Sequence, residues 1–288
     1  MDEPTAITLL HPGEMGASLG AALRRRGNRV LHVIDGRSAA TCARAAAAGL
    51  EPVRTLAGAL AQSAVVLSVC PPDAAVAVAH DVAATGFRGL YVDANAVAPT
   101  TAARIAEIVE GAGAAFVDGD VIGGPVASGS GTRVYLSGAT AATFAACFPS
   151  GDPDVRVLGA HPTAASTLKM CYAAWTKGSS ALLLAVVAAA SAGGVADALY
   201  EEWRRSQPDV LDRLERGVRN HPRKAWRFAG EFDEIAETFT ATGLPDGFAR
   251  AAAEVSRRMA AFKDGPPPVL DDVIASLLAP SPRDGALR

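Results

Sequence analysis

The stretch that decides the fold runs Ala6-Ile7-Thr8-Leu9-Leu10-His11-Pro12-Gly13-Glu14-Met15-Gly16. An apolar β-type run ends at a glycine turn and passes directly into a helical pattern. This order is typical of the first strand, turn and helix of a dinucleotide-binding fold, whose glycines allow a tight turn and a close approach of the backbone to a pyrophosphate. Gly13 and Gly16 hold the second and third glycine positions of the usual pattern, and His11 replaces the first. On these residues alone, an ordinary strand-to-helix turn is an equal alternative.

The same alternation of apolar strands and alanine-rich helices continues to about Leu158. Such alternation predicts a parallel sheet covered by helices on both faces. Strands are expected at 6–10, 29–34, 64–69, 90–93, 115–117, 132–137 and 155–158. Helices are expected between the earlier strands at 14–26, 38–48, 72–83 and 99–110.

Strand patterns stop after His161. Residues 163–191 predict one long helix, and shorter helices are expected at 195–206, 210–219, 223–242, 246–262 and 270–278. A chain of 288 residues is long enough for two domains. The sequence therefore predicts an α/β protein with a Rossmann-type doubly wound sheet in residues 1–160 and an all-α domain in residues 161–288.

Composition excludes several classes of protein. Half of the chain is hydrophobic and 20% is charged, which excludes general disorder. The net charge of −3 and the scattered arginines do not predict a nucleic-acid partner. The N-terminus has no secretory pattern, and the apolar segment 181–190 is shorter than the ~20 residues that a bilayer needs, so we expect a cytoplasmic protein with no membrane partner. The four cysteines have no C-x-x-C spacing, so we expect no metal site and place them in the core.

The loop after the second strand bears on the choice of cofactor. Asp35 lies roughly 20 residues beyond the glycine turn, where an acid can bind the ribose 2′-hydroxyl of NAD. Arg37 and Ser38 instead favour the 2′-phosphate of NADP, which they could bind through charge-assisted hydrogen bonds. In a third interpretation, Asp35 and Ser38 only cap the following helix.

Three further segments lie where the sheet would present its carboxyl edge. Cys70 and Pro71 follow one apolar strand and Asn95 follows the next, which places them at the ligand crevice of an open α/β sheet. The paired Gly123 and Gly124 follow another strand, and their backbone amides could bind an anionic group. A plain loop or turn is the alternative for each.

Lys169 lies on the long predicted helix among small and apolar neighbours. Tyr172 follows three positions later, on the same face of the helix. Such a lysine usually extends its ammonium group to solvent. The alternative is a partly desolvated proton-transfer group, since loss of water lowers the pKa of an ammonium from its usual value of ~10.4.

Together these motifs resemble the β-hydroxyacid dehydrogenase and 6-phosphogluconate dehydrogenase superfamily over most of the chain. Gly13–Gly16 is similar to its G-x-M-G turn, and residues 118–124 resemble its D-x-P-V-S-G-G substrate loop. Lys169 falls at its catalytic lysine, and Lys224 resembles the second lysine, in K-D-L-x-L-A. A little-characterised bacterial branch of NAD(P)-dependent oxidoreductases, with a short C-terminal domain of undefined role, is closer still in its H-P-G-E-M-G and R-S-A-A-T segments.

The sequence also departs from that pattern. Asp120 replaces the proline of the substrate loop, and Ile122 replaces the serine that would contact a substrate carboxylate. Tyr172 and Ala173 replace the two asparagines that would follow the catalytic lysine. Carboxylate recognition of the usual kind is therefore not expected.

The resemblance implies an NAD(P)-dependent oxidoreductase, with NADP favoured and NAD possible, that moves a hydride between nicotinamide and a carbonyl or alcohol carbon of a small molecule. It also implies a homodimer packed around the long helix. The catalytic residues would be Lys169 and Tyr172. The cofactor-binding residues would be His11, Pro12, Gly13, Glu14, Met15, Gly16, Asp35, Arg37, Ser38, Cys70, Pro71, Asn95 and Lys224, and the substrate-binding residues Asp120, Ile122, Gly123 and Gly124. The alternatives are an imine reductase, which the lysine disfavours, and a cofactor-binding protein that has lost catalysis.

Overall fold

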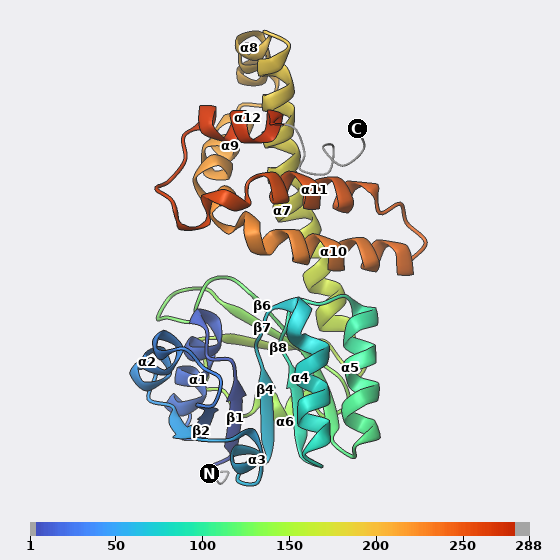
Figure 1. Cartoon of the computed structure of the whole chain (residues 1–288). Helices are drawn as coiled ribbons and strands as arrows, with labels where there is room; N and C mark the ends of the chain where they lie inside the picture. Colours follow the sequence, from blue (N-terminus) through green and yellow to red (C-terminus); the bar gives the residue numbers. More distant parts are fainter. Residues whose placement is uncertain (1–3, 280–288) are drawn as a thin grey trace, which may run out of the picture. The chain divides into compact units, whose positions relative to one another are not determined.

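The computed structural model describes residues 4–279. The chain divides into two compact units, Met1–Met170 and Cys171–Arg288 (Figure 1). The sequence placed this boundary after residue 160. The division falls later, inside a helix, because the first two turns of that helix are hydrogen-bonded to the sheet of the first unit.

An eight-stranded sheet forms the first unit, in the order β3-β2-β1-β4-β5-β6-β7-β8. Its strands are β1 Ala6–Leu10, β2 Arg29–Val33, β3 Glu51–Val53, β4 Val65–Ser68, β5 Leu90–Asp93, β6 Ala115–Ile122, β7 Arg133–Ser137 and β8 Asp154–Val157. The predicted parallel sheet is confirmed from β3 to β6. The prediction is wrong at β7, which runs antiparallel to β6. The two strands can pair in this direction because a loop, and not a crossover helix, joins them.

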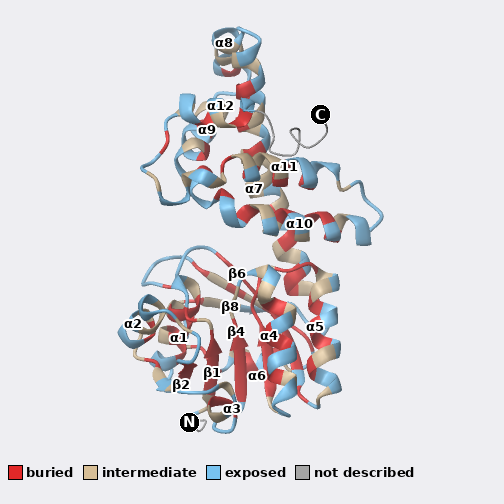
Figure 2. Ribbon diagram, viewed as in Figure 1, coloured by how far each residue is buried: buried red, intermediate tan, exposed pale blue. Residues whose placement is uncertain are grey.

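Helices cover both faces of this sheet, as expected. They are α1 Glu14–Arg25, α2 Ala39–Ala47, α3 Leu56–Leu60, α4 Pro72–Ala84, α5 Pro99–Gly111 and α6 Ala141–Ala145. Alternate strand side chains point to opposite faces, so Ile7 and Leu9 of β1 belong to one core cluster with Leu19 of α1. Tyr91 of β5 belongs to a second cluster with Ile105 of α5. Figure 2 shows the buried sheet between helices that carry both buried and exposed residues.

Helices are the only regular secondary structure in the described part of the second unit, as predicted. Its elements are α7 Ala164–Ala192, which begins in the first unit, α8 Ala196–Ser206, α9 Asp209–Asn220, η1 Pro222–Lys224, α10 Ala225–Ala241, α11 Gly247–Arg258, η2 Ala260–Asp264 and α12 Leu270–Leu278. Leu184 and Val187 of α7 pack in one core cluster with Trp203, Leu214 and Met259.

Helix α7 is less buried within the single chain than its apolar sequence predicts. Leu182 is 63% exposed, and Cys171, which we expected in the core, is exposed as well. Of the described helices, only α7 is long and apolar enough to cross a membrane, and 28% of its most apolar window is buried. Helix α7 therefore presents an exposed apolar face within the described residues.

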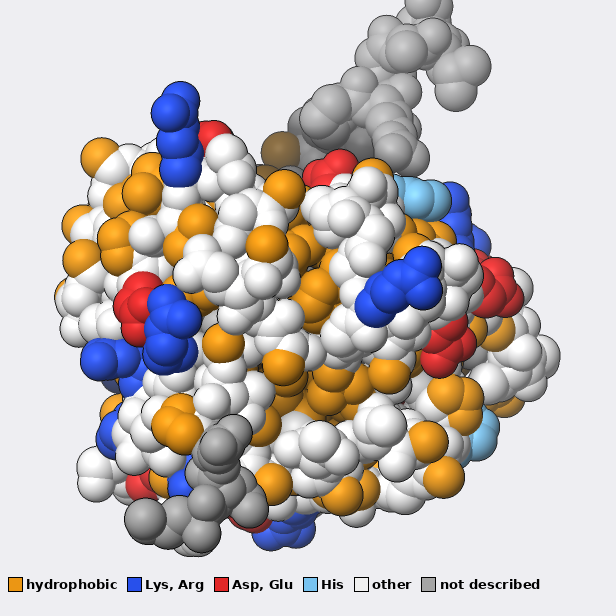
Figure 3. All heavy atoms as spheres, turned by 90° about the horizontal axis from the view of Figure 1, so that it is seen from below, with side chains coloured by type: hydrophobic (Ala, Val, Ile, Leu, Met, Phe, Trp, Pro, Cys, Tyr) orange, Lys and Arg blue, Asp and Glu red, His pale blue; other side chains and the backbone are white. Residues whose placement is uncertain are grey.

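The face of the molecule seen in Figure 3 presents single Lys and Arg side chains scattered among neutral and acidic ones. This distribution agrees with the small net charge of the chain, −3.

Candidate active site

The glycine turn has the geometry of an anion site. His11 adopts φ 60°, the left-handed region that a glycine would occupy at no cost, so it replaces the first glycine of the pattern in conformation as well as in position. A Cβ atom on Gly16 would lie 3.0 Å from the carbonyl oxygen of His11, which explains the glycine there. Gly13 caps α1 with no side-chain hydrogen bond. The amides of the first turn of α1 can therefore bind a pyrophosphate.

The His11 imidazole suits the same ligand. Burial, together with the charge of Arg37, lowers the pKa of His11 to about 4, so the ring is neutral at neutral pH. Its Nδ1 atom is buried and has no hydrogen-bond partner within residues 4–279. In the tautomer that carries a proton there, Nδ1 can donate a hydrogen bond to a phosphate oxygen.

Two arginines lie near this turn. The charge of Arg37 acts on both His11 and the Cys70 thiol, and burial raises the pKa of that thiol to about 12. Arg44 of α2, which the sequence analysis missed, donates from Nη1 to the carbonyl oxygen of Pro12 at 3.3 Å. The sequence feature that could have identified Arg44 is its position, seven residues after Arg37 on the helix that follows the cofactor loop. Both arginines add positive charge beside the anion site.

The other residues of this loop have partners of their own. Ser38 caps α2 and accepts a hydrogen bond from the amide of Thr41 at 3.2 Å, as the capping interpretation predicted. Asp35 lies 3.8 Å from Arg54 in an exposed pair. The Ser38 hydroxyl also shares a hydrogen bond of 3.0 Å with Thr41 Oγ1, so it can donate to a ligand when Thr41 is the donor in that contact.

Asn95 joins the ends of two neighbouring strands. Its side chain is buried, and its Oδ1 accepts a hydrogen bond from the amide of Cys70 at 2.5 Å. Its Nδ2 donates to Ser68 Oγ at 3.1 Å and to Asp93 Oδ1 at 2.5 Å. The side-chain amide of Asn95 therefore positions the strand ends beside the predicted cofactor crevice, and Pro71 is the N-cap residue of α4 at the same edge.

Three carboxyl groups are buried where β5 ends beside β6. Asp93 and Asp118 are partners across these strands, and Asp120 lies two residues further along β6, on the face that Asp118 occupies. Burial, and then the charge of Asp118, raises the pKa of Asp93 well above its usual value. Burial also raises the pKa of Asp118 to about 6.

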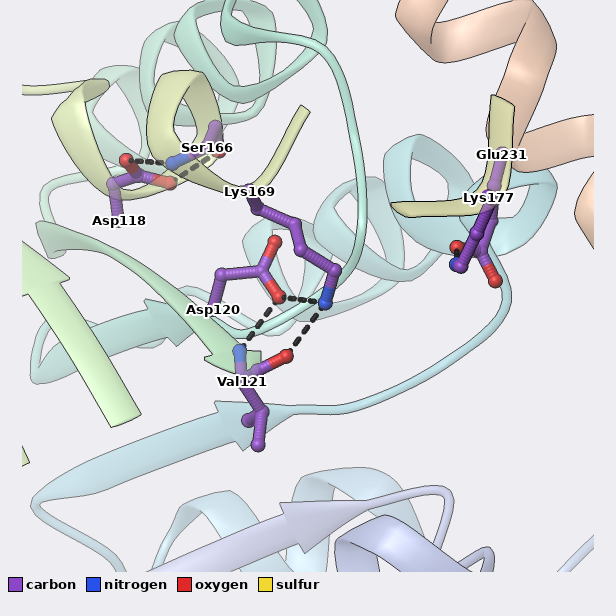
Figure 4. A network of polar contacts seen from close by, with 7 residues as sticks. All are labelled: Asp118, Asp120, Val121, Ser166, Lys169, Lys177 and Glu231. Atoms are coloured by element: carbon purple, nitrogen blue, oxygen red, sulfur yellow. Dashed lines mark hydrogen bonds and ion pairs between the residues drawn. The ribbon is translucent and has the colours of Figure 1, made fainter. Parts of the chain in front are cut away.

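Asp118 holds the start of α7. Its Oδ1 accepts from Ser166 Oγ at 2.5 Å, and its Oδ2 accepts from the Ser166 amide at 2.9 Å (Figure 4). Its Oδ2 also accepts from Ser137 Oγ at 3.0 Å. The amide of Ala165 donates to Ser137 Oγ at 3.0 Å. A carboxylate at a helix N-terminus satisfies amides that have no partner within the helix and interacts favourably with the helix dipole.

Asp120 holds Lys169 one turn later. Lys169 Nζ lies 2.7 Å from Asp120 Oδ1 and donates to the carbonyl oxygen of Val121 at 2.6 Å (Figure 4). The Val121 amide also donates to Asp120 Oδ1, at 2.6 Å. Only 14% of the Lys169 side chain and 3% of the Asp120 side chain are exposed, so the lysine does not extend to solvent. An ammonium has three N–H donors, and the two contacts leave one for a ligand.

The remaining predicted residues are distributed over both units. Ile122 is 5% exposed and belongs to the packed interior. Gly123 has φ 128°, and a Cβ there would lie 3.0 Å from the Thr132 backbone, so this turn requires glycine. Tyr172, 45% exposed, lies on the part of α7 that belongs to the second unit. Lys224 also lies in the second unit, where it lines a pocket with Lys177.

We predict that Ser166→Ala destabilises the protein by about 1–3 kcal/mol, because it removes a buried donor from the Asp118 carboxylate. Chemical denaturation of the full chain measures the loss. Ser206→Ala is the matched control, because its hydroxyl makes an exposed bond within α8, and we expect a change within about 0.5 kcal/mol. Equal effects in the two variants would contradict the anchoring role.

Comparisons with known proteins agree with this geometry. Residues 6–150 match the family described as the NAD binding domain of 6-phosphogluconate dehydrogenase. Residues 190–259 match a domain of unknown function, DUF1932. The comparison with curated proteins found no match.

Solved structures share the fold of the whole chain. A conserved hypothetical protein from Sinorhizobium meliloti 1021 is 27% identical, with 95% of each chain covered and a TM-score of 0.66. Mycobacterium tuberculosis 3-hydroxyisobutyrate dehydrogenase with L-serine is 19% identical, with a TM-score of 0.71 over 96% of this chain and 100% of that chain. An imine reductase variant from Myxococcus stipitatus in complex with NAD+ is 17% identical, with a TM-score of 0.54 over 96% of this chain and 100% of that chain. The last two similarities concern the fold alone.

The matched residues 6–150 make up just over half of the 288-residue chain. They include the glycine turn, the Asn95 contacts and the Asp118 and Asp120 carboxylates. The chain therefore belongs to the family of the NAD binding domain of 6-phosphogluconate dehydrogenase.

Proposed function

We propose that the protein is an NAD(P)-dependent oxidoreductase that interconverts a carbonyl and an alcohol on a small molecule, with NADP as the favoured cofactor. The observation that carries this proposal is the buried Lys169–Asp120 pair at the carboxyl edge of an NAD-binding sheet. A buried ammonium with a spare N–H donor beside a cofactor crevice is suited to proton transfer.

The glycine turn fits a dinucleotide. The amides at the start of α1 and the Nδ1 atom of His11 would bind the pyrophosphate, and Arg37 would bind a 2′-phosphate. Arg44 would add to the positive charge from beside Pro12. When bound, the nicotinamide supplies or accepts the hydride.

Lys169 handles the proton that accompanies the hydride. During reduction the substrate oxygen gains negative charge, and the third N–H of Lys169 donates a proton to it; during oxidation the amine takes that proton back. Asp120 is a positioning residue, because it holds Nζ at 2.7 Å and is itself fixed by the Val121 amide. The low exposure of the pair limits competition from water.

The Lys169–Asp120 pair also affects which substrates the site would accept. The positive charge of Lys169 is balanced by Asp120. The pair therefore offers no net positive charge to a carboxylate beside the reacting carbon. These contacts favour a substrate with a neutral group next to its carbonyl carbon.

We also propose that two copies of the chain associate through an apolar groove of about 540 Å³ on the second unit. Leu182 of α7 and Phe248 of α11 line it, and they are 63% and 80% exposed. A face this apolar is unfavourable in water, and a second copy of α7 would cover it.

Light scattering at micromolar concentration should therefore give twice the chain mass of 29.3 kDa. Leu182→Glu should shift this mass toward the monomer, because a charge would be buried in the groove. Ala189→Glu, on the same helix but outside the groove, is the control. A monodisperse monomer of the parent protein would contradict the proposal.

For the cofactor, we predict that Arg37→Ala weakens the binding of NADPH more than that of NADH by about 1.5–3 kcal/mol, the contribution of a charged hydrogen bond. Titration of each nucleotide by calorimetry measures this difference. Arg54→Ala, which removes an arginine from the exposed pair with Asp35, should leave the preference nearly unchanged. If the parent protein binds both nucleotides equally, the NADP preference is wrong.

For catalysis, we predict that Lys169→Ala lowers kcat by ~10²–10⁴ and leaves cofactor affinity nearly intact, because the lysine acts on the substrate oxygen. Lys169→Arg should not restore activity, since a guanidinium stays protonated. Steady-state oxidation of NADPH with a panel of carbonyl compounds provides the measurement, with Lys263→Ala as the control.

Tyr172→Phe should cost less than Lys169→Ala if the tyrosine only assists. If Tyr172→Phe abolishes turnover while Lys169→Ala is mild, the proton comes from the tyrosine, and reduction of imines becomes the better proposal. Nucleotide binding with no turnover of any carbonyl or imine would leave only a cofactor-binding role.

A further inference from the structure

A second site lies wholly within the helical unit. It is a pocket of about 440 Å³ between α7 and α9, with residues of η1 and α10 at one end. Its lining includes four cationic side chains, those of Lys177, Arg213, Arg216 and Lys224, and no described lining residue is acidic. In a chain with a net charge of −3, this is a local concentration of positive charge.

Helix α9 supplies the arginines from a single face. Arg213, Arg216 and Asn220 are spaced three and four residues apart and all line the pocket. The guanidinium of Arg213 lies over the ring of Trp175 at 5.9 Å, a contact that orients it. From α7, the hydroxyl-bearing Ser179 lines the same space.

These arginines differ from others in the same unit. Arg250, Arg257 and Arg258 each form an ion pair with an Asp or Glu. Within residues 4–279, Arg213, Arg216 and Lys224 have no acidic group within the 4.0 Å that defines such a pair. Their positive charge is therefore available to a ligand.

Two other side chains of the pocket, those of Lys177 and His221, add no net charge to it. Lys177 pairs with Glu231, and both side chains are largely buried. His221 is buried beside them, and burial, followed by the charge of Lys177, lowers its pKa to about 4, so it is neutral at neutral pH. The net positive charge thus comes from Arg213, Arg216 and Lys224.

We propose that this pocket binds a small molecule that carries a phosphate or carboxylate group, held by Arg213 and Arg216. The planar guanidinium groups match such oxyanions through paired hydrogen bonds, and the volume lies in the usual range of small-molecule sites. Asn220 and Ser179 can hydrogen-bond the remaining oxygens. This site goes beyond the proposed redox function, because Arg213 and Arg216, which would hold the ligand, have no role in that function. Lys224, which the resemblance assigns to the cofactor, is not required for the site.

Calorimetric titration of the full chain with inorganic pyrophosphate and, separately, with citrate tests the proposal and tells the two oxyanion sources apart. We expect saturable binding of at least one probe, weakened at least tenfold in the Arg213→Gln/Arg216→Gln variant. The control Arg204→Gln/Arg205→Gln removes the same charge from exposed positions on α8 and should bind as the parent does.

The glycine turn could also bind pyrophosphate, and the Arg37→Ala variant distinguishes binding there from binding at the pocket. Binding at the pocket is expected to survive Arg37→Ala. The proposal is overturned if neither probe saturates the parent protein, if both double variants lose affinity equally, or if the binding disappears with Arg37 alone. None of these outcomes depends on turnover, so they leave the redox proposal untouched.

Discussion

Two carboxylates on one face of β6 fix the start of α7 and the position of its lysine. Buried carboxylates are costly unless they are hydrogen-bonded or paired, so Asp118 and Asp120 require the partners that they find in Ser166 and Lys169. These contacts make the first two turns of α7 part of the sheet unit. They also explain why the compact units divide after Met170 and not where the strands end.

The charge balance at this edge follows from the same contacts. The charges of Lys169 and Asp120 cancel each other, and burial, followed by the charge of Asp118, raises the pKa of Asp93 well above its usual value. Asn95 donates to Asp93 and accepts from the Cys70 amide, which joins β4 to β5 beside the glycine turn. The edge thus combines strand ends that are fixed by hydrogen bonds with a single ammonium that can reach a ligand.

Much of this arrangement could be predicted from the sequence, because it is local. The bounds of β1 and β5 follow from short apolar runs, and the glycine turn and the Ser38 cap follow from residue type and spacing. The partner of Lys169 could not be predicted, since Asp120 is 49 residues away in the chain. The antiparallel direction of β7 could not be predicted either, because it depends on how the loop after β6 folds. The exposure of Leu182 depends on how much of α7 is covered by the rest of its own chain.

A double-mutant cycle on Asp120 and Lys169 tests the central pairing most directly. Asp120→Asn, Lys169→Met and the double variant would be compared by kcat for a carbonyl compound that the parent protein reduces. If Asp120 acts only through the lysine, Asp120→Asn lowers kcat in the parent but costs nothing further in Lys169→Met. Losses that multiply in the double variant would contradict this role, and would show that the carboxylate acts on the reaction independently of the lysine.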